Sequence, residues 1–195
     1  MEKKITTELT ATSIISKAQI ENYLEWTAND DTEDALIADL VEGAIRLCED
    51  HTGEAFGEKT VEVWVRSDDL DEDDRVDLPF PPFGEMTSVT PYDVENTAGD
   101  ALVLNTGYYL NGLKKKSIKL LTEKFLVGSD LDQSYWKIIY TCGYDISEVT
   151  EAIPETYKYV IMELVRRWYK REEKQGVISE DLKADLDIIC GNTVL

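Results

Sequence analysis

The spacing of apolar residues changes twice along this chain, and few arrangements of helices and strands accommodate both changes. Between residues 33 and 51 apolar residues recur every three or four positions, which is the spacing of one face of a helix. From Thr60 to Arg66 the spacing falls to two, as in a strand with one buried face. The helical spacing returns after Pro154. This order predicts an α+β fold, in which N-terminal and C-terminal helices are packed with a small antiparallel β-sheet or hairpins.

Capping residues place the ends of the predicted helices. Ser16 precedes Gln19 by three positions, the spacing at which each side chain satisfies the other's backbone N–H. Pro154 suits the start of a helix, because its missing N–H is not needed there. Helices are predicted over residues 17–26, 33–51, 154–175 and 179–191, and further strands over 86–92, 101–104, 108–110, 117–121 and 136–141.

The length and composition favour one soluble domain with extensions at both ends. The 195 residues suffice for one hydrophobic core, and a hydrophobic content of 43% argues against disorder across the chain. We expect a flexible N-terminal arm over 1–15, one domain over 16–176, and a C-terminal docking helix and tail over 177–195. No apolar run is long enough for a transmembrane helix or a signal peptide. The three widely separated cysteines fit a reducing cytosol.

The formal charge of −20 limits the partners of the chain. Binding to a nucleic-acid backbone relies on Lys and Arg side chains that neutralise phosphates, so direct DNA binding is not expected. An anionic membrane surface is excluded for the same reason. Two interpretations remain open. The charge serves solubility, or it forms a surface that DNA must pass without adhering.

No constellation predicts a catalytic residue, a cofactor or a metal. His51 is the only histidine, and no Ser or Cys nucleophile is placed beside it by the sequence. Asp69, Asp71 and Asp73 have the first spacings of a calcium loop. The glycine that such a loop needs is replaced by Asp74, and its bidentate Glu by Phe80.

Basic clusters and the last helix offer candidate contacts. Lys114 and Lys115 follow the Asn111-Gly112 turn, where they would either be solvated or touch DNA phosphate or an acidic neighbour. The basic residues near 166–171 would likewise be solvated or pair with acids of an adjacent subunit. The helix at 179–191 is too short to be stable alone, so it must dock on its own domain or on a partner.

A series of short motifs is spread over residues 16–174. They are His51-Thr52-Gly53-Glu54-Ala55-Phe56, Leu78-Pro79-Phe80-Pro81-Pro82, Ser88-Val89-Thr90, Tyr140-Thr141-Cys142-Gly143-Tyr144, Ile153-Pro154 and Arg166-Arg167-Trp168-Tyr169. In this order the chain resembles the head–tail connector (adaptor) proteins of long-tailed bacteriophages. It departs from that pattern in Cys142, where Ala is usual, in the acidic insert at 68–77 and in the helix after Gly176.

The resemblance implies a structural virion protein and not an enzyme. Such a subunit forms a homo-oligomeric ring, expected to be dodecameric, which docks beneath the portal protein and extends the DNA channel toward the next neck, stopper or tail protein. It would be found in the virion neck and, during assembly, in the host cytoplasm. A heterologous interface that closes on itself makes such a ring.

Residues are assigned to these roles as hypotheses. Leu182, Leu186 and Ile189 are expected to dock on the portal. Subunit contacts are expected from Tyr157, Arg167, Trp168 and Tyr169, since Tyr, Trp and Arg are enriched at interfaces. The channel is expected to be lined by Asp71, Asp73, Asp74, Lys114 and Lys115, so that genomic DNA passes without specific binding. The alternative is an acidic DNA-mimic inhibitor, which the charge suits and the motif series does not.

Overall fold

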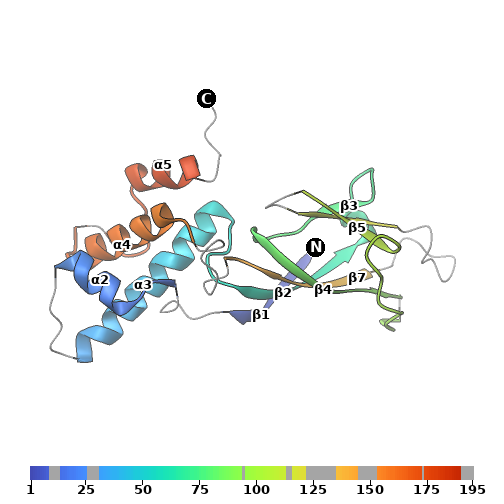
Figure 1. Cartoon of the computed structure of the whole chain (residues 1–195), viewed down its shortest axis with the longest axis horizontal. Helices are drawn as coiled ribbons and strands as arrows, with labels where there is room; N and C mark the ends of the chain where they lie inside the picture. The colour runs from blue at the N-terminus through green and yellow to red at the C-terminus, as the bar shows by residue number, and fades with distance from the viewer. Residues whose placement is uncertain are drawn as a thin grey trace. The chain divides into compact units, whose positions relative to one another are not determined.

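The chain divides into two compact units, each built from separated segments. The computed structural model describes residues 1–8, 14–25, 31–93, 95–112, 116–121, 135–144, 153–172 and 174–189. The strand unit comprises Met1–Glu8 and Glu58–Gly143, and the helical unit comprises Leu9–Gly57 and Tyr144–Leu195. Figure 1 shows the strands of the first unit and the helices of the second. The segment expected as one domain, 16–176, contributes to both units. The two segments of the helical unit pack on each other although the strands lie between them in the sequence.

The strand unit is centred on a four-stranded antiparallel sheet with the order β1-β2-β7-β4. Its strands are β1 (Glu2–Glu8), β2 (Lys59–Arg66), β4 (Phe83–Tyr92) and β7 (Tyr135–Cys142). The central pair is in register at Val63 and Ile138, and both side chains are buried. Alternating β-branched residues favour this arrangement, because they pack well on one face of a pleated sheet.

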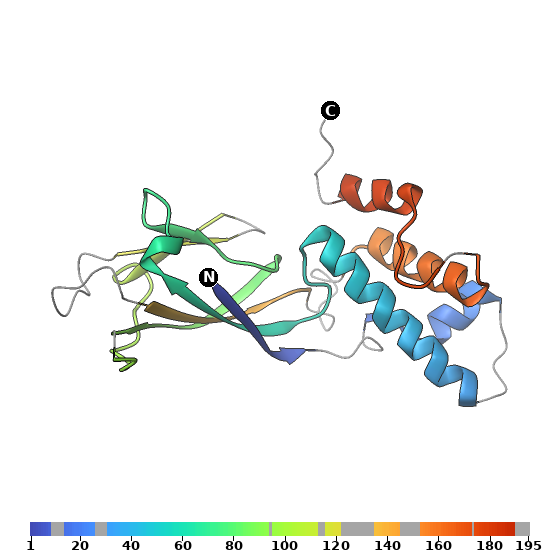
Figure 2. The ribbon, with the colours of Figure 1, turned by 180° about the vertical axis from the view of Figure 1, so that it is seen from behind.

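A second antiparallel sheet has the order β3-β6-β5. Its strands are β3 (Arg75–Asp77), β5 (Tyr108–Asn111) and β6 (Ser117–Leu120), and a 3₁₀ helix, η1 (Ser67–Asp69), precedes β3. Figure 2 shows this sheet lying over the larger one. Ile118 and Tyr140, one from each sheet, have no exposed surface. The core of the strand unit therefore lies between two sheets.

The helical unit contains α2 (Lys17–Leu24), α3 (Asp31–Thr52), α4 (Glu155–Tyr169) and α5 (Glu180–Ile189). The capping box predicted at Ser16 and Gln19 is present at the start of α2, and Pro154 is the N-cap of α4. The core joins all four helices, with fully buried side chains such as Ala44, Leu164 and Leu186. No helix among the described residues has both the length and the apolarity that crossing a membrane requires.

The predicted fold class is confirmed, and the main differences concern short or exposed strands. Residues 2–8, expected in a flexible arm, form the edge strand β1 paired with β2. This strand lacks an apolar alternation because it lies at the edge of the sheet, where Ile5 is 41% exposed. Residues 101–104 form no strand, and instead Leu104 makes an isolated bridge to Tyr108 and Leu102 donates its N–H to the Val89 carbonyl at 2.7 Å. The acidic segment, expected as a loop, contains β3 at its end.

The C-terminal boundary expected at residue 177 also differs from the structure. Leu182 and Leu186 of α5 belong to the core of the helical unit, 2% and 0% exposed. The last helix is therefore part of this unit as far as Ile189, and it is stabilised by burial of its own apolar stripe.

Candidate interaction surfaces

The motif at residues 51–56 ends helix α3 and contacts residues that come about 90 to 100 positions later in the sequence. Gly53 adopts a positive φ of 68° and donates its N–H to the Glu49 carbonyl, which ends the helix. Glu54 is 8% exposed, and its carboxylate accepts hydrogen bonds from the hydroxyls of Tyr144 at 3.1 Å and Tyr157 at 2.9 Å. The ring of Phe56 stacks on Tyr157 at 4.5 Å. Two of the motifs that carry the family resemblance thus meet in the core of the helical unit, where both contact Tyr157 of α4.

The proline-rich motif at residues 78–82 packs against the end of β7 in the strand unit. The carbonyl of Pro79 accepts a hydrogen bond from Tyr140 Oη at 2.5 Å, and that of Pro82 accepts one from the Gly143 N–H at 2.8 Å. Phe83 and Tyr140 stack with ring centroids 5.7 Å apart. Burial raises the pKa of the Tyr140 hydroxyl, which keeps it a donor. These two motifs have a structural role, since each supplies the hydrogen-bond partners of the other.

Helix α5 is attached to the rest of the helical unit by polar contacts as well as by its leucines. The Arg167 guanidinium donates to Ser179 Oγ at 2.7 Å and to Asp181 Oδ2 at 2.7 Å. Trp168 Nε1 donates to the Val177 carbonyl at 3.3 Å. Near the C-terminal end of α5, the Asp187 carboxylate Oδ1 lies 3.0 Å from His51 Nε2 of α3. The single histidine therefore contacts a carboxylate of the terminal helix.

Glu163 is the centre of a buried charge cluster on α4. Arg166 binds both of its carboxylate oxygens, at 2.7 Å and 2.8 Å, and Arg167 Nε donates at 2.8 Å. Tyr23 Oη of α2 donates at 2.9 Å. The pKa of Glu163 is lowered from 4.5 to about 2, mainly by the hydrogen bonds from Arg166. Burial acts in the opposite direction, and the hydrogen bonds from Arg167 and Tyr23 lower the pKa further. This cluster joins α2, α4 and, through Arg167, α5.

The residues predicted at subunit contacts lie mainly inside the helical unit. Tyr157 and Trp168 are 1% and 5% exposed and belong to its core. Arg167 is engaged with Glu163, Ser179 and Asp181 of the same chain, and Tyr169 is half-buried against the core. These side chains hold the unit together, and their part in contacts between subunits stays a prediction.

The residues predicted to dock on the portal lie on α5. Leu182 and Leu186 are buried in the core of their own chain, so α5 would have to leave this core before they touched a partner. The side chain of Ile189 lies outside the described residues. Ile188, on the opposite face of the helix, is 65% exposed. The outer face of α5 is therefore the one that a partner can reach.

Three of the five residues predicted to face a channel are described, and all three lie in the acidic segment. Asp73 is exposed. Asp71 is exposed too, but its Oδ1 accepts hydrogen bonds from the amides of Asp73 and Arg75, each at 2.9 Å. Asp74 is half-exposed at a φ of 61°. Asp71 therefore shapes the turn. Lys114 and Lys115 lie outside the described residues.

The calcium-loop spacing does not bring its carboxylates together. Asp69 binds the amino group of Met1 at 2.6 Å and accepts the Arg66 N–H at 2.9 Å, while Asp71 caps the turn. Among the residues that the structure describes, no group of three or more His, Cys, Asp or Glu side chains is arranged to hold a metal ion.

An aromatic surface on the outer face of the larger sheet was missed by the sequence analysis. Trp64 lies 5.0 Å from Tyr92, centroid to centroid, and Lys137 Nζ lies 5.5 Å from the Trp64 ring. Arg66 stacks over Tyr135 at 5.6 Å. A hollow of about 570 Å³ beside it is lined by Met1, Glu2, Trp64, Arg66, Asp68, Asp69, Asn96 and Tyr135. The sequence did contain one indication of this surface, because Trp64 occupies a position of β2 where the alternation predicts a polar, exposed side chain.

Known structures share this fold over nearly the whole chain, although the sequence matches no family model and no curated protein. A chain from the neck of an empty gene transfer agent (GTA) particle, computed with C6 symmetry, has a TM-score of 0.71 and 17% identity, covering 96% of this chain and 94% of its own. A chain from the virion of the native particle has a TM-score of 0.72 and 16% identity, with coverages of 96% and 94%.

A chain from the neck of the native GTA particle, computed with C12 symmetry, has a TM-score of 0.72 and 15% identity, covering 97% of this chain and 94% of its own. Identities this low establish the fold alone. The chain has the fold of chains from the neck and virion of gene transfer agent particles, in agreement with its sequence resemblance to head–tail connector proteins.

Proposed function

We propose that this chain is a structural subunit of the neck of a phage or phage-like particle, where it forms a ring between the portal and the tail. The observation that carries the proposal is the shared fold, which covers 96% or 97% of this chain in structures of a GTA virion or neck. One of those necks was computed with C12 symmetry, which supports a ring of twelve copies. The role is structural, and the motif residues serve the fold and not a reaction.

The acidic charge fits a channel through which DNA moves. A surface rich in carboxylates repels phosphates, so that DNA passes without specific binding. In this proposal the turn at 71–74 faces the channel. Because Asp71 caps the turn and β3 belongs to a sheet, deleting the segment would damage the fold. Reversing the exposed charges of Glu72 and Asp73 tests the role without removing a backbone hydrogen bond.

The Glu72→Lys/Asp73→Lys variant is expected to assemble on the portal as the wild type does. Particles built with it should release DNA at least several-fold more slowly at low salt, because cations bind passing phosphates, and the difference should shrink as salt rises. Glu95→Lys/Asp100→Lys, also exposed and in the same unit, is the control for charge alone. Equal release rates for all three would exclude a channel role for this turn.

Docking on the portal is assigned to α5. The buried state of Leu182 and Leu186 favours contact through the outer face of the helix, around Ile188, unless α5 detaches. The proposed location is the virion neck, preceded by the host cytoplasm during assembly, and the other partners are the portal and the next neck, stopper or tail protein.

Imaging of the purified chain mixed with its portal tests this function directly. A ring of this chain seated on the portal, coaxial with its channel, is the expected result. A portal that stays bare while the chain instead occupies a DNA-binding enzyme would refute the proposal and support the DNA-mimic alternative.

A further inference from the structure

The residues that follow α4 present a basic edge, formed by Lys170, Arg171 and Lys174. Lys170, Arg171 and Lys174 are exposed, and within the described residues none of them makes an ion pair. Arg166 and Arg167, one turn earlier, are instead occupied by Glu163 and Asp181. Val177 follows this edge and is 48% exposed. In a chain with a formal charge of −20, three exposed cations that form no ion pair with a described residue, next to an exposed apolar side chain, make an unusual surface.

A groove between α2 and α3 is apolar inside and acidic at its rim, in contrast to the basic edge. It has a volume of about 210 Å³ and is lined by Ile15, Lys17, Ile20, Asp34, Ile37, Ala38 and Val41. At its rim Lys17 Nζ contacts both Asp34, at 2.5 Å, and Glu21, at 3.5 Å. Two carboxylates thus share one ammonium group, which leaves a negative charge at the mouth of an apolar groove.

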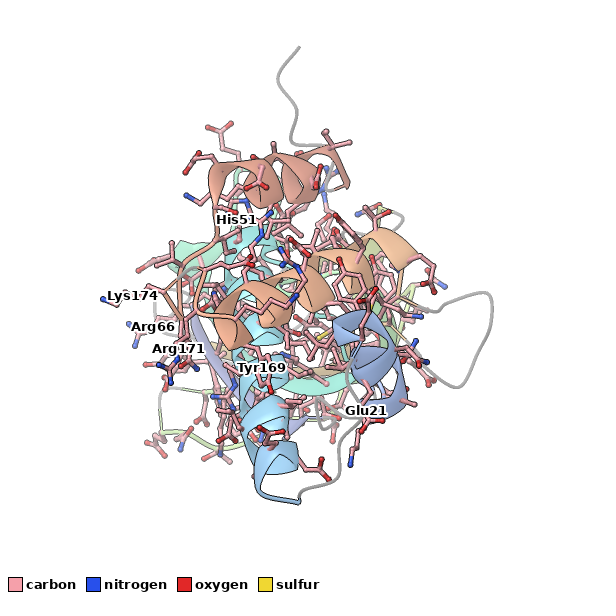
Figure 3. The ribbon with its side chains drawn as sticks, turned by 90° about the vertical axis from the view of Figure 1, so that its left-hand side faces the viewer. Glu21, His51, Arg66, Tyr169, Arg171 and Lys174 are labelled. Carbon is pink, nitrogen blue, oxygen red and sulfur yellow. The ribbon has the colours of Figure 1, made fainter. Side chains whose placement is uncertain are left out.

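The basic edge and the groove lie on opposite sides of the helical unit. Figure 3 shows Arg171 and Lys174 on one side and Glu21 on the other, with Tyr169 between them. The two surfaces therefore cannot meet within one copy, whereas they can meet between adjacent copies. Complementary patches on opposite sides of a subunit give a heterologous contact, which closes into a ring when the rotation allows it.

We propose that the basic edge of one copy docks on the α2–α3 groove of the next copy, with Val177 in the groove and Lys174 at the carboxylates of Glu21 and Asp34. This inference rests on the proposed ring function and names the surfaces that form the ring. The partner is a second copy of this chain, because each surface supplies the charge that the other lacks. High net charge opposes association, so the contact forms when salt or a portal template reduces the repulsion.

Cysteine crosslinking tests the contact in the full-length chain bound to its portal. In a Cys190→Ser background, a chain with both Val177→Cys and Ala38→Cys is expected to give a ladder of disulfide-linked oligomers under mild oxidation. A mixture of the two single variants is expected to stop at covalent dimers, and neither single variant should crosslink with itself. Ala98→Cys with Ala38→Cys is the matched control, since Ala98 is exposed and belongs to the strand unit.

Charge reversal tests the electrostatic part independently of the crosslink. Lys174→Glu is expected to weaken assembly about tenfold, and Glu21→Lys in the same chain is expected to restore most of it. Lys4→Glu makes the same change of net charge at an exposed position of β1 and should alter assembly by less than about threefold.

Each outcome distinguishes the contact from the function on which it rests. A ladder together with rescue by Glu21→Lys supports the contact. Rings that form normally with Lys174→Glu and give no ladder overturn the contact but leave the proposed function in place. A wild-type chain that forms no ring with its portal at any salt concentration overturns both.

Discussion

At the scale of single residues, two buried carboxylates connect distant segments of the helical unit. Glu54 and Glu163 receive hydrogen bonds from residues far away in sequence, Glu54 from Tyr144 and Tyr157, and Glu163 from Tyr23. Burial of a charged group is costly unless it is paired and hydrogen-bonded. Glu163 meets this condition through Arg166 and Arg167. The Glu54 carboxylate accepts hydrogen bonds from two tyrosine hydroxyls, so an apolar replacement at either position leaves donors without an acceptor.

Replacing Glu163 by Gln is expected to lower the free energy of unfolding by about 2 kcal/mol at pH 7, because two guanidinium groups lose their shared carboxylate. The pKa of Glu163 is lowered from 4.5 to about 2 in the folded chain. Its stabilisation is therefore complete above pH 4.5 and is lost as the pH falls toward 2. Urea unfolding should show a steeper loss between these pH values for the wild type than for Glu163→Gln.

Glu155→Gln on the same helix is the control for that experiment. Its side chain is 83% exposed and pairs only with Lys158 among the residues described. Its effect should stay below about 1 kcal/mol, because exposed ion pairs contribute little. Equal effects of the two substitutions would contradict the assigned role of Glu163.

Two glycines give a second test at this scale. A Cβ on Gly84 would lie 2.6 Å from Thr141 Oγ1 and 3.1 Å from the Thr141 carbonyl oxygen, so Gly84→Ala should destabilise the strand unit by about 1–3 kcal/mol. On Gly43 a Cβ would lie 3.7 Å from the Trp168 ring, an ordinary contact. Gly43→Ala should therefore stabilise the helical unit by up to about 1 kcal/mol. Thermal unfolding of both variants checks the opposite signs.

Single-residue roles were harder to predict than structural motifs. Tyr157, Trp168 and Arg167 have side chains common at interfaces, but the structure uses them inside the helical unit. The sequence does not distinguish these uses, because a stripe of aromatic and basic residues fits both a core with a polar rim and a docking surface. Arg167, for example, is held inside the unit by Ser179 and Asp181, which lie at the start of α5 and not on α4.

At the scale of elements, α5 shows how a short helix becomes stable. Leu182 and Leu186 are buried, and Arg167 and His51 bind its acidic residues. Leu186→Ala should cost about 2–4 kcal/mol and increase amide hydrogen exchange throughout α5, because it leaves a cavity in the core. Ile188→Ala, on the exposed face, should change stability by less than about 0.5 kcal/mol. Similar exchange in both variants would show that α5 is not held by this core.

Elements with a strong hydrophobic period could be predicted, and short or edge elements could not. The helix predicted at 33–51 is α3, and the valine alternation is β2. β1 was expected as an arm because an edge strand needs little apolar surface of its own when its hydrogen bonds come from a neighbour. β3 has only three residues, and it is fixed by pairing with β6 about 40 residues later. Such pairings depend on the fold and leave no local pattern.

At the scale of the whole molecule, the chain divides into two units that are each built from segments far apart in the sequence. The strand unit takes in the N-terminal strand, and the helical unit takes in both ends of the remaining chain. This arrangement was not predictable from local patterns, since it depends on β1 pairing with a strand more than 50 residues away. The predicted α+β class was correct because each unit retains the hydrophobic period of its own segments.

The net charge governs assembly at this same scale. With a formal charge of −20 per copy, neighbouring subunits repel each other most strongly at low salt. A free chain is therefore expected to be monomeric at low salt and to assemble when salt or the portal offsets this repulsion.

The mass of the purified chain, measured alone and with its portal across a series of salt concentrations, tests the central claim most directly. We expect a ring-sized assembly of about twelve copies, formed at high salt or on the portal, since a chain of similar fold comes from a neck computed with C12 symmetry. A chain that stays monomeric with the portal at every salt concentration, and that competes with DNA for an enzyme, would contradict it.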